Sequence, residues 1–323
     1  MYRRALFGLL LLAAGASLAP LQAMAAGYPE KPVKVIVSLP PGSGADTTAR
    51  FLAKHLAQQL GQPFVVENKT GGNSFIAAKA VAEAAPDGYT MFVASNTPMV
   101  TNAAVFRQLP YDPVKDFMAV ASTRGFPMLI VLPAAAPYQN LSQLVGGMKA
   151  APGKLNFASG TPSYQVAMEL FHERNGIRGT PVTYKGTGPA VSDLAAGVCD
   201  YSIAEVSSVL PLIRGGKLRA LAVASAQRHR DLPDVPTAAE LGNPGFEAFA
   251  WTAVFFPANV PADIAQRVGD IVRATLNGAE GTAFINGMGG SVFTGSAQDL
   301  ARFQLSEIET TRRVVRTANI PIE

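Results

Sequence analysis

The stretch that decides the fold is residues 33–47, which reads VKVIVSLPPGSGADT. Its first five residues are mostly β-branched and predict a buried strand, which the proline- and glycine-rich turn then ends. Beyond the turn, leucines recur at every fourth position and predict one apolar helix face: Leu52, Leu56 and Leu60. A strand, a glycine-containing turn and a helix in this order are typical of a parallel α/β unit.

The same alternation of strand and helix continues along the chain. The further predicted strands are residues 64–67, 89–94, 154–158, 181–184, 200–204 and 218–223. The further predicted helices are residues 76–85, 164–175, 190–196, 209–214, 262–276 and 297–317. Strands that alternate with helices in units of this length predict a mainly parallel sheet with helices on both faces.

Long apolar runs separate the two sets of strands. Residues 117–122 and 127–132 lie between the sets, and residues 246–256 follow the second set. We therefore expect an α/β fold of two lobes, each a mainly parallel sheet flanked by helices, joined by two crossover strands. The expected division is residues 26–124 for the first part of lobe 1, 125–225 for lobe 2, and 226–323 for the return crossover and the remainder of lobe 1.

The N-terminal residues 1–25 are predicted to be a secretory signal peptide. Arg3 and Arg4 precede an apolar run shorter than the roughly 20 residues that a membrane span needs. Ala23-Met24-Ala25 then fits the cleavage rule of small residues. We expect a protein that is exported to the periplasm and soluble after cleavage.

Composition excludes several classes of protein. The chain has 323 residues, of which 48% are hydrophobic, and it contains one cysteine and three histidines. This hydrophobic content excludes a disordered chain, and a single cysteine excludes an intramolecular disulfide and a multi-cysteine zinc site. Removing the two arginines of the signal peptide lowers the formal net charge from +4 to +2. Since no basic cluster appears, no nucleic-acid partner is expected.

Three predicted strand-to-helix turns share a glycine-rich design, at residues 40–47, 158–163 and 184–189. In a parallel sheet such turns lie at the carboxyl edge of the strands, where ligands bind. The first N–H groups of a helix lack intrahelical partners and can hold a carboxylate or phosphate without a cationic side chain. Each turn alone is compatible with an ordinary capped helix, but three in two lobes favour a ligand cleft. Asp46 is expected to cap its helix and not to act as a base.

Enzyme motifs are missing from the sequence. Gly42-Ser43-Gly44 imitates a dinucleotide fingerprint, but Thr47 stands where the third glycine is needed. The sequence contains no G-x-S-x-G elbow, no H-E-x-x-H and no G-x-x-x-x-G-K-[ST]. The histidines are not adjacent to a serine or cysteine and are interpreted as surface or helix-face residues. We therefore expect no catalysis, no cofactor and no metal.

At this point a family resemblance emerges from eight motifs that follow one another along nearly the whole mature chain. They are YPEKP (28–32), PPGSGAD (40–46), VENK (66–69), APDGYT (85–90), LPYDPVKDF (109–117), YKGTGPA (184–190), GKLRALAV (216–223) and LPDVPT (232–237). In their order and number they resemble the substrate-binding receptors of tripartite tricarboxylate transporters, also called the Bug family.

The resemblance implies a periplasmic binding protein, type II-like, that closes over a small organic carboxylate. It implies delivery of this anion to the large and small membrane subunits of the transporter, with backbone amides and waters gripping the ligand. By matching position, the implied ligand-binding residues are Ser43, Gly44 and Asp46 in the first turn, Ser159, Thr161 and Ser163 in the second, Asn96 after the third strand, and Tyr184 before the third turn.

Three departures from the family pattern leave the ligand open. Asn73 and Ser74 stand where glycines are usual, and Tyr164 or Gln165 stands where a histidine is common. Glu205 follows Ala204 where the family often has Asp-Asn. A Glu205 that faces the cleft would repel a second carboxylate and could attract an amine or hydroxyl, whereas one that faces solvent would do neither. Asn73, Ser74 and Glu205 therefore join the candidate binding residues.

Two other functions are weighed against transport. A sensory module that feeds ligand to a signalling receptor would use the same closed form. A periplasmic hydrolase would need a Ser–His pair, for example Ser163 with His172. These two residues are about 13 Å apart along one helix, which is too far for a hydrogen bond.

Overall fold

The computed structural model describes residues 27–184 and 186–322, so the predicted signal peptide at residues 1–25 lies outside the described residues. The strands are β1 (Val33–Val37), β2 (Phe64–Asn68), β3 (Thr90–Ser95), β4 (Phe117–Pro133), β5 (Asn156–Ser159), β6 (Thr180–Thr183), β7 (Tyr201–Glu205), β8 (Leu218–Val223), β9 (Phe249–Pro257) and β10 (Ser291–Val292). The helices are α1 (Gly44–Leu60), α2 (Phe75–Ala82), α3 (Asn102–Val105), α4 (Leu141–Ala150), α5 (Pro162–Asn175), α6 (Thr187–Ala195), α7 (Val206–Arg214), α8 (Ala262–Asn277), α9 (Ala279–Gly287) and α10 (Ala297–Thr317). Short turns of helix lie at η1 (Gly72–Ser74), η2 (Thr97–Thr101) and η3 (Ala239–Leu241).

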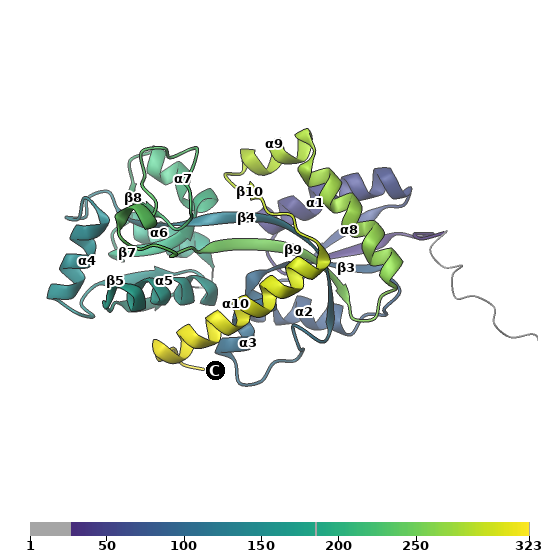
Figure 1. The fold of residues 1–323 in the computed structure, drawn as a ribbon, viewed down its shortest axis with the longest axis horizontal. Coiled ribbons are helices and arrows are strands. Elements are labelled where there is room, and N and C mark those ends of the chain that lie inside the picture. The colour runs from purple at the N-terminus through teal and green to yellow at the C-terminus, as the bar shows by residue number, and fades with distance from the viewer. Residues whose placement is uncertain (1–26, 185, 323) are drawn as a thin grey trace, which may run out of the picture.

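The strands form two half-sheets that share β4. The order along the sheet is β2-β1-β3-β9-β4-β7-β5-β6, and β8 and β10 also pair with β4. Strands β2, β1 and β3 are parallel in lobe 1, and β6, β5 and β7 are parallel in lobe 2. Figure 1 shows the two lobes side by side, with β4 and β9 running between them.

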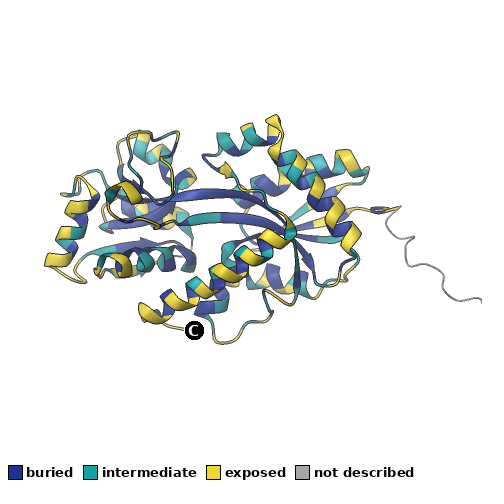
Figure 2. Cartoon of the chain, in the orientation of Figure 1, coloured by how far each residue is buried: buried dark blue, intermediate teal, exposed yellow. Residues whose placement is uncertain are grey.

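Strand β4 is the first crossover, and it contains both apolar runs, 117–122 and 127–132, in one continuous strand. It pairs with β9 from Phe117 to Pro127 and with β7 and β8 beyond that point. Register shifts between Ala119 and Ala121 and between Ser122 and Arg124 bend it where it leaves lobe 1. Figure 2 shows that β4 and β9 are buried along most of their length, as their apolar sequences require.

Helices cover both faces of the lobe 1 half-sheet. Leu52 of α1 and Val268 of α8 pack with Val35 on one face, while Ala78 of α2 and Leu300 of α10 pack against the other. These contacts follow from the apolar stripes that the sequence places on each helix. The long helix α10 therefore packs on the lobe 1 half-sheet through its N-terminal part.

The far end of α10 also contacts lobe 2. Arg313 donates to Glu173 of α5 at 2.7 Å, and Val314 packs with Val105 of α3 and Val166 of α5. Figure 1 shows α10 running diagonally from the crossover strands toward α5. The C-terminal helix thus bridges the lobes, which its sequence pattern does not reveal.

The boundaries of the lobes remain a proposal. Residues beyond 225 still pack in the lobe 2 core, including Leu232, Ala238 and Phe246. We therefore propose that lobe 2 extends to about residue 248, where β9 begins its return. Among the described helices, none is long and apolar enough to cross a membrane.

Candidate functional site

The N-termini of helices from both lobes meet where the lobes join. Five residues define this junction cluster: Gly44, Arg124, Tyr164, Thr187 and Glu205. An added Cβ on Gly44, the first residue of α1, would collide with the Arg124 guanidinium. The Tyr164 hydroxyl lies near the Thr187 side chain and the Glu205 backbone; burial raises its pKa well above the ordinary value, while both of these neighbours act to lower it. The starts of α1, α5, α6 and α7 are thereby brought together around one buried arginine.

The first turn is held rigid by Asp46, which is buried. Ser43, and not Asp46, is the N-cap of α1, and its side chain accepts the Asp46 N–H at 3.3 Å, which corrects the predicted cap. The Asp46 carboxylate instead accepts the Gly42 N–H and the Asn68 side-chain amide, each at 2.9 Å. It also pairs with Arg50 at 3.0 Å. All these bonds are internal, so Asp46 shapes the turn, while the first N–H groups of α1 lack intrahelical partners.

Replacing Asp46 is expected to destabilise the fold in a pH-dependent way. Burial raises the pKa of this carboxyl, but hydrogen bonds from Arg50, Gly42 and Asn68 outweigh it and lower the pKa below its ordinary value. The stabilisation is therefore present above the unfolded pKa, near 4, and is lost as pH falls through the folded pKa. Asp46→Ala is expected to cost about 2–3 kcal/mol at pH 7 in urea denaturation.

Asp270→Ala serves as the control for this experiment. Asp270 is 59% exposed on α8 and pairs with Arg273, so its removal is expected to change stability by less than about 0.5 kcal/mol. A stability difference between wild type and Asp46→Ala that stays constant from pH 7 to pH 3 would contradict the role given to Asp46.

The second turn joins the lobes through a serine. Thr161 caps α5 by accepting the Tyr164 N–H at 3.3 Å, and the buried Ser159 hydroxyl donates to the Thr161 carbonyl at 3.0 Å. Ser163 bonds across to lobe 1, with its hydroxyl 3.1 Å from Thr97 and 2.7 Å from Thr101. Its hydroxyl is therefore engaged in a contact between lobes.

The third turn directs its tyrosine away from the junction cluster. The Tyr184 hydroxyl donates to Asp193 of α6 at 2.9 Å and lies 3.5 Å from the buried Cys199 sulfur. Gly186 follows as the N-cap of α6 with a φ of 126°, a conformation that favours glycine. The start of α6 is thus left without a side-chain cap.

The turn after β2 is left-handed throughout. Gly71, Gly72, Asn73 and Ser74 all have positive φ, although the last two carry side chains. The Asn73 carbonyl accepts the Asn102 side-chain amide at 2.8 Å, which ties this turn to α3. Asn73 is exposed and Ser74 is buried, while Asn96 directly precedes η2 and gives it no side-chain cap.

Glu205 ends β7 and precedes α7, where it is half-buried. Its carboxylate accepts the Ser208 hydroxyl at 3.2 Å. Its charge also acts on two members of the junction cluster, because it raises the pKa of both Arg124 and Tyr164. The side chain is half-buried, and the one hydrogen bond of its carboxylate is to Ser208 in the first turn of α7.

Arg124 was missed by the sequence reasoning. It lies in the break between the two apolar runs that form β4, and it is only 3% exposed. Burial lowers its pKa to about 10, against the opposing influence of Glu205 and Tyr164, so the guanidinium stays charged at neutral pH. A signal was available, since Arg124 is the only charged residue between Asp116 and Lys149.

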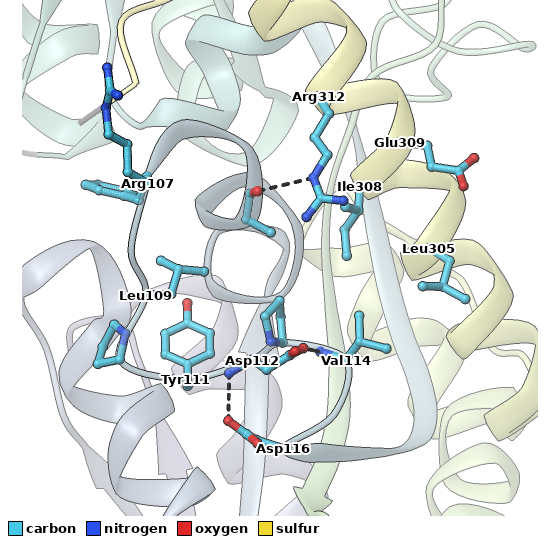
Figure 3. Close-up of a pocket in the computed structure, with 14 residues that line it drawn as sticks. Arg107, Leu109, Tyr111, Asp112, Val114, Asp116, Leu305, Ile308, Glu309 and Arg312 are labelled. Atoms are coloured by element: carbon cyan, nitrogen blue, oxygen red, sulfur yellow. Dashed lines mark hydrogen bonds between the residues drawn. The ribbon is translucent and has the colours of Figure 1, made fainter.

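A surface pocket of about 670 Å³ lies elsewhere, in lobe 1 between the 106–116 segment and α10. Figure 3 shows Arg312 of α10 reaching into it and donating to the Ala103 carbonyl, at 3.3 Å, and Asp116 accepting the Asp112 N–H, at 2.6 Å. None of the candidate binding residues lines this pocket. Arg312 and Asp116 in this pocket already form hydrogen bonds within lobe 1. The pocket is not part of the junction cluster.

The structure does not pair Ser163 with His172, as the hydrolase alternative would require. Ser163 bonds to threonines, and His172 bonds instead to Glu169 at 2.9 Å and to the Tyr201 hydroxyl at 2.8 Å. His229, expected at the surface, is buried and lies 2.8 Å from the Gly289 carbonyl. In residues 27–184 and 186–322, no group of three His, Cys, Asp or Glu is placed to hold a metal ion.

The family described as "Tripartite tricarboxylate transporter family receptor" matches residues 48–320. The chain belongs to this family. Among its relatives, Protein BugT of Bordetella pertussis is 34% identical over 292 residues, which cover 90% of each protein. Two solved structures are 32% identical to this receptor. Rpa4515 of R. palustris with adipate has a TM-score of 0.83 and covers 91% of this chain and 99% of its own. MatC of Rhodopseudomonas palustris with bound malate has a TM-score of 0.79 and covers 89% of this chain and 100% of its own.

These comparisons confirm the predicted Bug-family membership and the two-lobed periplasmic binding protein fold. They also confirm that the receptor's relatives are binding proteins and not enzymes.

Proposed function

We propose that this receptor binds a small organic carboxylate between its lobes in the periplasm and delivers it to the membrane subunits of a tripartite transporter. The observation that carries the proposal is the convergence of helix N-termini from both lobes on the junction cluster. Partial positive charge at these ends stabilises an anion, and the unpaired N–H groups can donate to its oxygens. The binding of adipate and malate by similar proteins supports a carboxylate.

Closure of the lobes would follow from contacts that only the closed state provides. A ligand that touches α1 and the lobe 2 helices gains both sets of hydrogen bonds only when the lobes meet, so it shifts the population toward closure. The crossover strands β4 and β9 are the continuous connections about which such a motion would occur. The closed shape is what the membrane subunits would recognise.

Isothermal titration calorimetry of the mature protein tests the ligand class. The panel contains mono-, di- and tricarboxylates, amino acids, and the neutral amide of each acid. At least one carboxylate is expected to bind, and to stabilise the fold by roughly 2.7 kcal/mol when present at 100 times its Kd. Its neutral amide is expected not to bind. Absence of binding across the whole panel would contradict the proposal.

A further inference from the structure

Arg124 is a buried cation without a hydrogen-bond partner in the described structure. The side chain is 3% exposed, and its Nε and Nη1 atoms are buried and unbonded. The guanidinium lies 4.0 Å from the centre of the Phe126 ring. A ring face offers a cation–π contact but no acceptor for N–H donors. Burying a charged group in this state is unfavourable unless a partner arrives to satisfy it.

The position of Arg124 points this cation at the start of α1. In the sheet, Thr252 of β9 is level with both Arg124 of β4 and Ser95 of β3. The buried Ser95 hydroxyl is also unbonded in the described structure. The guanidinium meets Gly44, where only the missing side chain of glycine leaves it room. Unsatisfied donors from β3, β4 and α1 therefore lie on the lobe 1 side of the junction.

Lobe 2 does not neutralise this charge by direct contact. The Glu205 carboxylate is bonded to Ser208 at 3.2 Å and makes no ion pair with Arg124 in the described residues. The Tyr164 hydroxyl lies near the Thr187 side chain and the Glu205 backbone, and it carries no negative charge at neutral pH because its pKa is raised by burial. The described residues therefore supply no carboxylate that pairs with the Arg124 guanidinium.

We propose that Arg124 is the charged anchor of the receptor, which pairs with one carboxylate of the ligand beside the free N–H groups of α1. A planar guanidinium can hold both carboxylate oxygens at once, which fixes the orientation of the ligand as well as its charge. The proposal rests on the proposed function and deepens it. The selected ligands are ionised carboxylates, with the rest of the molecule extending toward Glu205 in lobe 2.

A purely structural role for Arg124 makes the opposite predictions. If the cation–π contact with Phe126 were its purpose, its loss would destabilise the ligand-free protein and leave affinity unchanged. If Arg124 is instead paired only when a ligand is bound, replacing it with methionine, which is apolar and of similar length, removes an unpaired buried charge. The ligand-free protein is then stabilised. The two roles therefore predict opposite changes in the stability of the ligand-free protein and different changes in ligand affinity.

The test compares Arg124→Met, Arg124→Lys and Arg302→Met with wild type, by calorimetry with the carboxylate that binds wild type and by thermal unfolding without ligand. Arg302 is 76% exposed on α10 and controls for the loss of one positive charge. Arg124→Met is expected to weaken binding roughly 100-fold or more and to raise the ligand-free Tm. Arg124→Lys keeps the charge but loses the two-pronged geometry, and is expected to bind with intermediate affinity. Arg302→Met is expected to bind as wild type.

The outcomes separate this proposal from the proposed function. A wild type that binds carboxylates, together with an Arg124→Met variant that binds within threefold of it, overturns the anchor and leaves the receptor function standing. A lower ligand-free Tm with unchanged affinity also overturns the anchor in favour of the structural role. A wild type that binds no carboxylate overturns both.

Discussion

Gly160→Ala is expected to lower the free energy of unfolding by about 2–3 kcal/mol and to weaken ligand binding at least tenfold. An added Cβ on Gly160 would lie 2.6 Å from the Thr187 Cα and 3.0 Å from the Thr187 N. Both are backbone atoms at the start of α6, so no side-chain rotation can relieve the clash. Overpacking of this kind typically costs about 1–3 kcal/mol.

The effect on binding follows from the place of Gly160 in the fold. It lies in the second turn, and the added methyl group would push the starts of α5 and α6 apart. Both helix ends contribute to the junction cluster, and displacement of binding groups by about 1 Å is enough to lose much of their effect. Urea denaturation and calorimetry with a bound carboxylate measure the two consequences separately.

Gly146→Ala is the matched control for this prediction. Gly146 is an exposed residue inside α4 of the same lobe, and an added Cβ there meets no atom within 4 Å. The same chemical change is expected to stabilise the protein by about 0.5–1 kcal/mol, since alanine favours the helix interior more than glycine. Equal behaviour of the two variants would contradict the close packing of the second turn against α6.

The elements that build the lobes could be predicted because their signals are local. The β-branched run at β1 and the leucines of α1 give the correct strand and helix. Gly61 ends α1 in the left-handed conformation that glycine favours. Helix α4 was not predicted, because Gly146 and Gly147 in its centre weaken the helical pattern. Periodicity thus predicted the helices that have a regular apolar spacing, and it failed for a helix whose centre contains glycines.

The direction of the site's side chains could not be predicted, because it depends on partners distant in sequence. Ser163 bonds to Thr101 of the other lobe, 62 positions away. Even the nearer partner of Tyr184, Asp193, is brought to it only by the fold of the next helix. Arg124 differs from these residues because two of its guanidinium nitrogens have no partner in the described structure. Its importance comes from burial and from the missing partner, neither of which a sequence displays, although a lone charge between apolar runs draws attention to the position.

Glu205→Gln is expected to change which carboxylates the receptor prefers. The Glu205 charge acts on Arg124 across the junction, where it opposes the effect of burial on the arginine's pKa. A ligand anchored on Arg124 therefore places the rest of its structure in the field of a negative charge. A second carboxylate there is repelled, and an ammonium or hydroxyl group is attracted.

Glutamine removes this charge while keeping an oxygen that can accept the Ser208 hydroxyl bond, now 3.2 Å long. The loss of Glu205 strengthens the field of Arg124 for every anion, so the informative quantity is a ratio of two affinities. We expect the ratio of dicarboxylate to monocarboxylate affinity, at equal chain length, to rise on the order of 10- to 100-fold. Amino acids of the same length are expected to bind more weakly than to wild type.

Calorimetry on wild type, Glu205→Gln and Glu83→Gln measures this ratio. Glu83 is 66% exposed beyond the end of α2 and pairs with Lys79, so its replacement removes a charge without touching the junction. Glu83→Gln is expected to keep the wild-type ratio. If Glu205→Gln also keeps that ratio within a factor of two, the charge of Glu205 does not discriminate between dicarboxylates and monocarboxylates. The shape of lobe 2 must then set the preference.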